Sequence, residues 1–207
     1  FATKAIMGLH YILPRADLQD LVRAYYYFAT RDVSVQPICA EMGNIRIILD
    51  GGGVLQTPNG ASHTISGAFL IGPTMGSYCM EAHAGTRVFG IGIRPQGWIK
   101  LCGISAEEAA DSIIDLSSFA GGIARSSIEE IRNAKSVTDM GKAADRFFTE
   151  LLRKSDSEPA SSFPYALANW LLDPNDRGVD HLLERMDLSR RQTDRLAKMY
   201  FGASPKY

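Results

Sequence analysis

The spacing of the hydrophobic residues changes at Pro95 and divides the chain into a β-rich part and a helical part. Before Pro95, apolar residues form short runs separated by turn residues. Residues 45–49, for example, end at Asp50 and three glycines. Short apolar runs bounded by Gly, Pro, Asn and Asp are typical of strands. Many such runs at near-regular spacing predict a β-sandwich or a small barrel, rather than alternating strands and helices.

Further strand signals and one hairpin signal support this prediction. The turn at residues 57–61 contains Asn59-Gly60, a pair suited to a tight hairpin. The strands that we expect cover residues 10–13, 21–29, 45–49, 68–71, 78–81 and 87–93.

Helical signals dominate after Pro95. Residues 97–103 predict a short helix, and Ser105 followed by Glu108 has the form of a capping box that opens another. Two longer helices at 123–133 and 137–152 predict an α-hairpin. Its expected core residues are Phe147, Phe148, Leu151 and Leu152.

A chain of 207 residues can hold one large domain or two small ones. Residues 155–163 are small and polar, which is typical of a linker. We therefore expect a domain at 1–154 and a second at 164–207. In the second, a helix over 164–172 would complete a three-helix core with Leu167, Trp170, Leu171 and Leu172.

The last part of the chain predicts two helices around a tight turn. The first covers about 179–185, and the second begins after Ser189, whose hydroxyl is a good N-cap. It ends near Phe201, because Gly202 suits the left-handed C′ position and Pro205 follows.

The second helix has two faces. Thr193, Leu196, Ala197 and Tyr200 share one stripe, which would face inward. Arg191, Asp194, Arg195 and Lys198 share another. A cationic stripe beside an inward stripe suits a helix that enters the DNA major groove. The alternatives are an ordinary solvated face and a helix-turn-helix that only serves packing.

The motif Leu188-Ser-Arg-Arg-Gln-Thr-Asp-Arg, with Phe201-Gly-Ala-Ser-Pro, resembles the first helix-turn-helix of AraC-type transcriptional regulators. Thr193 and Ala197 depart from the family pattern, which has Leu and Phe there. The resemblance implies a second unit, and the chain ends where the helix joining the two would begin. The residues expected to contact duplex DNA are Ser189, Arg190, Arg191, Asp194, Arg195 and Lys198.

Gly72-Pro-Thr and the run from Phe89 to Trp98 are similar to the N-terminal sensor domain of one AraC-type subfamily. The resemblance implies a cupin-like β-barrel followed by helices, hence an α+β fold overall. Its aromatic run at 25–28 alternates between faces, so Tyr25, Tyr27 and Phe89 would line a ligand pocket or only fill the core.

The sequence lacks the motifs of a phosphate-binding loop, a metal site or a hydrolase. The glycines after Asp50 lack the Gly-Lys-Ser/Thr ending of a phosphate loop, and four scattered histidines form no metal-ligand pair. We find no nucleophile elbow or paired catalytic carboxylates, so we expect no catalytic residues, metal or cofactor. No apolar run is long enough to span a membrane. The three cysteines predict free, buried thiols in a reducing cytoplasm.

The sequence therefore predicts a cytoplasmic, non-enzymatic transcriptional regulator of AraC type. Its net charge of -1 neither favours nor excludes nucleic acid. Its N-terminal domain would bind a small-molecule effector or a second copy of the chain. The alternative is a cupin-like enzyme or small-molecule binder whose helix-turn-helix is a packing element.

Overall fold

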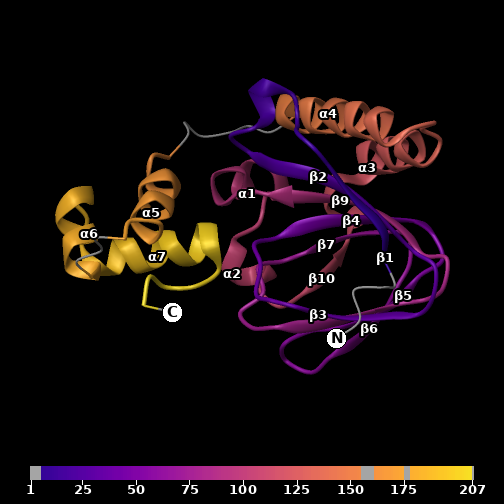
Figure 1. Ribbon diagram of the computed structural model, residues 1–207. Coiled ribbons are helices and arrows are strands. Elements are labelled where there is room, and N and C mark those ends of the chain that lie inside the picture. The colour runs from indigo at the N-terminus through magenta and orange to yellow at the C-terminus, as the bar shows by residue number, and fades with distance from the viewer. Residues whose placement is uncertain (1–5, 155–160, 175–177, 207) are drawn as a thin grey trace.

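Antiparallel strands make up the first half of the chain and helices the second (Figure 1). The computed structural model describes residues 6–154, 161–174 and 178–206. The strands are β1 (Ile6–Ile12), β2 (Val22–Thr30), β3 (Ser34–Ile38), β4 (Asn44–Asp50), β5 (Gly53–Gln56), β6 (Ser62–Ile65), β7 (Ala68–Ile71), β8 (Tyr78–Ala82), β9 (Arg87–Ile93) and β10 (Ile113–Asp115). The helices are η1 (Ala16–Leu18), α1 (Pro95–Cys102), α2 (Ala106–Ala109), α3 (Leu116–Arg132), α4 (Val137–Lys154), α5 (Phe163–Leu171), α6 (Val179–Met186) and α7 (Arg190–Phe201).

The strands form two antiparallel sheets. One has the order β1-β2-β9-β4-β7-β10, and the other has the order β3-β8-β5-β6. Hydrophobic residues from both sheets meet in one cluster, which includes Leu55 and Met80 from the smaller sheet and Phe69 and Val88 from the larger one. The arrangement is an antiparallel sandwich, as the short strand signals predict.

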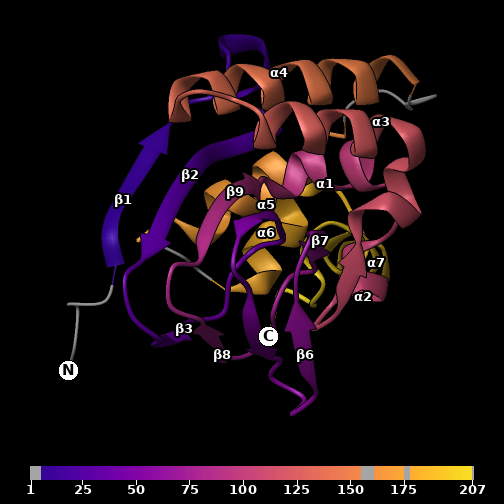
Figure 2. The ribbon, with the colours of Figure 1, turned by 90° about the vertical axis from the view of Figure 1, so that its right-hand side faces the viewer.

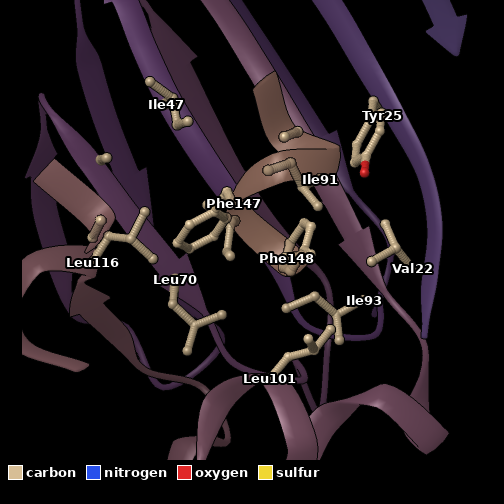
Figure 3. Packing of buried hydrophobic residues seen from close by; sticks show 14 of the residues in the cluster. Val22, Tyr25, Ile47, Leu70, Ile91, Ile93, Leu101, Leu116, Phe147 and Phe148 are labelled. Atoms are coloured by element: carbon tan, nitrogen blue, oxygen red, sulfur yellow. The ribbon is translucent and has the colours of Figure 1, made fainter. Parts of the chain in front are cut away.

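The larger sheet is buried on both faces, and successive side chains along its strands enter two different cores. In β9, Phe89 and Ile91 belong to the core beneath the helices, whereas Val88 belongs to the core between the sheets. Figure 3 shows the first of these cores from close by, with Phe147 and Phe148 of α4 among the labelled side chains. Both phenylalanines are almost fully buried, as predicted.

Helices α3 and α4 form the expected hairpin and cover the outer face of the larger sheet (Figure 2). Hydrogen bonds from β2 and from the segment before η1 tie α4 to the N-terminal part of the chain. The Tyr25 hydroxyl donates to Asp145 Oδ1 at 2.7 Å, and the backbone N–H of Arg15 donates to the same oxygen at 3.1 Å. Burial and the Asp145 hydrogen bond raise the pKa of Tyr25, so its hydroxyl stays a donor.

A third, smaller core joins α5, α6 and α7. Its buried residues include Leu167, Trp170, Leu182 and Tyr200. The prediction that Leu171 and Leu172 complete this core is wrong, because they are 57% and 82% exposed. Leu171 is the last residue of α5 and Leu172 is its C-cap, and the buried face of the helix ends at Trp170.

Three local features differ from the sequence expectations. Strands β3 and β10 are missing from them, because β3 contains Ser34, Gln36 and Pro37 and β10 has only three residues. Strands β5 and β6 were expected only through the turn between them, without ranges of their own. The hairpin between β5 and β6 has a longer loop than a two-residue turn, with Thr57 N donating to Ala61 O at 2.9 Å. Most of the expected linker, 155–160, lies outside the described residues, and Phe163 already belongs to α5.

Within the described ranges, no helix is both long and apolar enough to cross a membrane.

Candidate functional site

Local hydrogen bonds set both ends of α7. Ser189 and Gln192 form a capping box, in which the Gln192 backbone N–H donates to Ser189 Oγ at 3.3 Å and the Ser189 N–H donates to Gln192 Oε1 at 3.0 Å. Gly202 adopts a left-handed conformation with φ of 86° and closes the helix. The predicted limits of the second helix are therefore confirmed.

One face of α7 is buried against α5 and α6. Thr193, Ala197 and Tyr200 are 1%, 0% and 9% exposed, and Leu196 is half-buried in the same core. The Thr193 hydroxyl is buried and has no hydrogen-bond partner among the described residues. The inward stripe is thus confirmed, with a polar group where a larger apolar side chain would fill the core.

The opposite face of α7 presents two cations that have no ion-pair partner among the described residues. Arg191 and Arg195 lie one helical turn apart, are both exposed, and form no ion pair with any described residue. Arg190 differs, because its Nη2 lies 2.6 Å from Asp180 Oδ1. Asp194 lies half-buried between the two faces. Arg191 and Arg195 are therefore the groups on this helix that an anionic partner can reach without breaking an ion pair.

Lys198 instead connects α7 to the β-rich part of the chain. Its Nζ donates to Glu107 Oε1 of α2 at 2.7 Å, and this hydrogen bond raises the pKa of Lys198. Gly202 lies against the same region: an added Cβ there would be 3.0 Å from Met75 Cε and 3.3 Å from the Ala106 carbonyl oxygen. The end of α7 beyond Arg195 is therefore a contact surface within the molecule (Figure 1).

A second candidate site lies inside the β-sandwich. A cavity of about 420 Å³ opens between the edge strands β1 and β3. Its walls are mainly apolar, and Leu9 and Tyr11 at its rim are 49% and 69% exposed. The residues that line it also include Tyr26, Phe28, Ile38, Met80, Glu41 and Arg46.

A hydrogen-bonded cluster centred on Arg46 forms the polar end of this cavity. The Arg46 side chain is 5% exposed, and its Nη2 lies 2.9 Å from Glu41 Oε1 and 2.6 Å from the Tyr78 hydroxyl oxygen. Arg46 Nε lies 3.1 Å from both the Tyr26 hydroxyl oxygen and Asn44 Oδ1. Burial opposes the charge of Arg46, but Tyr26, Tyr78 and Glu41 raise the pKa of the guanidinium above its ordinary value.

Strand register determines which side chains enter this cavity. Tyr26, Gly90 and Arg46 are paired across β2, β9 and β4, and they share the face that points between the sheets. Gly90 makes room for the phenol, since an added Cβ would lie 1.9 Å from Tyr26 Cζ. Arg46 was not among the site residues expected from the sequence, although a charged residue within the apolar run 45–49 was the available signal.

The three aromatic residues expected at a pocket lie on the other face of the sheet. Tyr25 and Phe89 are fully buried beneath the helices, with ring centroids 5.9 Å apart. Tyr27 is half-buried and packs against the same core. None of the three lines the cavity, which takes Tyr26 and Phe28 from the same aromatic run.

The cysteines have different environments. Cys39 is exposed and lines the cavity, Cys79 is half-buried, and Cys102 is buried in a setting that raises its pKa. All three are free, as expected, but only Cys102 is buried. No group of three or more His, Cys, Asp and Glu side chains that could hold a metal ion occurs within the described ranges.

The fold is similar to that of several solved structures. ToxT from Vibrio cholerae matches over 85% of this chain and 75% of its own, with 9% identity and a TM-score of 0.51. An apo variant of ToxT matches over 85% and 74%, with 10% identity and a TM-score of 0.51. An RmlC-like cupin protein from Desulfovibrio desulfuricans matches over 44% of this chain and 84% of its own, with 12% identity and a TM-score of 0.34. The α+β class with a cupin-like β-domain followed by helices is confirmed.

A search of curated proteins finds no match to the sequence. One family model matches residues 10–115, just over half of the chain, from β1 to β10. The chain therefore belongs to the family described as a domain of unknown function, DUF6597.

Proposed function

We propose that this protein is a DNA-binding transcriptional regulator of AraC type, with a cupin-like domain that senses a small molecule. The observation that carries this proposal is the two-faced helix α7. Its inward face is buried against α5 and α6, while Arg191 and Arg195 are exposed and unpaired among the described residues. The AraC-like motif around Ser189 and Gly202 supports the same assignment, since both residues cap the helix.

The chemistry of these side chains suits a major groove. An arginine guanidinium can donate two hydrogen bonds to the O6 and N7 atoms of guanine, and two arginines one turn apart can reach neighbouring base pairs. Asp194 would accept from a cytosine amino group, whereas Ser189 and Arg190 lie at the start of the helix and would contact phosphate. In this assignment residues 1–154 sense the small molecule and residues 164–207 bind DNA.

The contact between α2 and α7 supports communication between the two parts. The Lys198–Glu107 ion pair and the packing of Gly202 near Ala106 bring the end of α7 against α2 of the β-domain. A change in the β-domain can therefore alter the position of α7 through a direct contact. A chain that used its interior cavity as a sensor would need such a connection.

The same contact favours one other function. In the alternative, α7 is a packing element and the molecule is a cupin-like binder or enzyme that works through its interior cavity. The packing of α7 on α1 and α2, together with the buried Arg46 cluster, is the observation that favours it. DNA binding by the exposed face of α7 distinguishes the two functions.

The experiment is a fluorescence-anisotropy titration of duplex DNA at several salt concentrations. The variants are Arg191→Ala/Arg195→Ala and a control, Arg125→Ala, which removes an exposed cation from α3. We expect the wild type and the control to bind with equal affinity and the same salt dependence, and the double variant to bind at least tenfold more weakly. Equal binding by all three proteins would favour the alternative.

A further inference from the structure

We propose that the interior cavity binds an uncharged, largely apolar molecule that carries one carbonyl-type acceptor, and that Arg46 Nη1 donates to this acceptor. The inference rests on the proposed function for the ligand's role as an effector. Binding itself can be measured without DNA, so the two proposals can fail separately.

Arg46 retains donor capacity at the cavity. Its guanidinium has five N–H groups, and those on Nε and Nη2 have oxygen acceptors from Tyr26, Asn44, Glu41 and Tyr78. Nη1 has only the Met80 thioether, at 3.2 Å, among the described residues. A thioether is a weak acceptor, so the described residues leave the donor capacity of the two Nη1 N–H groups largely unused.

The Arg46 Nη1 group, with its weak acceptor, lies in a buried side chain. The Arg46 side chain is 5% exposed, and an unmet hydrogen bond from a buried charged group is costly. Arg46 and Met80 both line the cavity, so a ligand oxygen beside Met80 can reach Nη1. Such an acceptor would complete the hydrogen bonding of the guanidinium.

The charge of the cluster favours a neutral ligand. Glu41 already pairs with Arg46 at 2.9 Å, and its Oε1 also accepts from Asn44 Nδ2 at 2.6 Å and from the Tyr78 hydroxyl. Burial raises the pKa of Tyr78, so this phenol contributes no negative charge of its own. A carboxylate ligand would therefore add an uncompensated negative charge beside Glu41, whereas a ketone, amide or ester would not.

The remaining walls determine the body of the ligand. The rings of Tyr26 and Phe28 lie 6.5 Å apart at an interplanar angle of 8°, and Ile38 and Met80 add apolar surface. A cavity of about 420 Å³ with such walls suits a flat apolar group of one or two rings. The polar end at Arg46 fixes the orientation of this group.

The test compares three naphthalenes that differ in one substituent: 2-acetylnaphthalene, 2-ethylnaphthalene and 2-naphthoate. Their affinities for the full chain are measured by isothermal titration calorimetry at pH 7.5. We expect the ketone to bind about tenfold more tightly than the hydrocarbon, because it adds a hydrogen bond to a charged donor. We expect it to bind at least tenfold more tightly than the carboxylate, because the carboxylate lies beside Glu41.

Glu41→Gln tests the electrostatic part of the argument. Glutamine keeps an oxygen that can accept from Arg46, Asn44 and Tyr78 but removes the charge. The affinity for 2-naphthoate should then rise at least tenfold. The control Glu81→Gln removes an exposed carboxylate from β8 and should leave all three affinities unchanged.

The proposal is overturned if the wild type prefers the carboxylate, if the ketone and the hydrocarbon bind equally, or if none of the three binds. It is also overturned if a folded Glu41→Gln protein shows no gain for 2-naphthoate. If Glu41→Gln does not fold, the order of affinities in the wild type still decides the matter.

Discussion

Lys198 Nζ lies 2.7 Å from Glu107 Oε1, although the two residues are 91 positions apart in the sequence. This ion pair joins the last turns of α7 to the first turn of α2. The DNA-binding assignment would otherwise give Lys198 a phosphate contact. In the structure its charge is directed to an acid of the β-domain, so under the proposed function DNA would compete with Glu107 for this ammonium group.

Glu107→Gln is therefore expected to raise affinity for duplex DNA. The substitution releases Lys198 and removes one acid near α7, and we expect a gain of about two- to fivefold at low salt that disappears at high salt. Fluorescence anisotropy at several salt concentrations measures it, with Glu81→Gln as the charge-matched control. Unchanged or weaker binding by Glu107→Gln would show that Lys198 does not take part in DNA contacts.

Thr193→Val is expected to stabilise the protein by about 1 kcal/mol, because it removes a buried hydroxyl without a partner among the described residues and keeps the shape of the side chain. Thr86→Val is the matched contrast. Its hydroxyl is equally buried but donates to the Gly52 carbonyl oxygen at 2.8 Å, so its loss should destabilise by about 1–3 kcal/mol. Urea unfolding measures both changes, and a loss of stability in Thr193→Val would contradict this account.

Gly90→Ala is expected to disturb the interior cavity, because the new Cβ would collide with the Tyr26 ring. We expect a destabilisation of about 1–3 kcal/mol and weaker binding of 2-acetylnaphthalene. Gly92→Ala on the same face of β9 is the control, since the nearest atom to its Cβ would be 3.6 Å away. Urea unfolding and calorimetry report both effects. If the two variants behave alike, Gly90 has no special role in the cavity.

Tyr25→Phe tests the connection between the sheet and α4. It removes the donor to Asp145 Oδ1, and we expect a loss of about 1–2 kcal/mol in the free energy of unfolding. Tyr27→Phe should cost little, because the Tyr27 hydroxyl makes no hydrogen bond in the described part of the chain. Chemical denaturation compares the two, and equal stability of Tyr25→Phe and the wild type would argue against this role of the hydrogen bond.

Local signals predicted the helix ends well because caps depend on neighbouring residues. The capping box at Ser105, the N-cap at Ser189 and the terminator Gly202 appear in the structure as expected, and Gln192 completes a second capping box at Ser189. The strands of the larger sheet other than β10 were also recognisable, since apolar runs end at turn residues. By contrast, β3 is polar and pairs only at an edge of its sheet, so its pattern resembles a loop.

The cavity could not be placed from the sequence, because both faces of the larger sheet are buried. Tyr25 and Tyr26 have similar chemistry, yet one faces α4 and the other faces Arg46. Side chains of β2 point alternately to its two faces. Which alternate set points between the sheets depends on where α3 and α4 pack, and this packing is a tertiary property. Leu171 and Leu172 show the same limit, since their exposure follows from where α5 ends.

The assignment of α7 as a recognition helix is tested most directly by selection of bound duplexes from a random DNA pool. The wild type, Arg195→Ala and Arg125→Ala are compared at one salt concentration, and the affinity for the selected sequence is then measured. We expect the wild type and Arg125→Ala to enrich the same sequence. Arg195→Ala should lose preference at one base position and bind the selected site about 1–3 kcal/mol more weakly. The account is contradicted if the wild type enriches no sequence, or if Arg195→Ala enriches the same sequence with unchanged affinity.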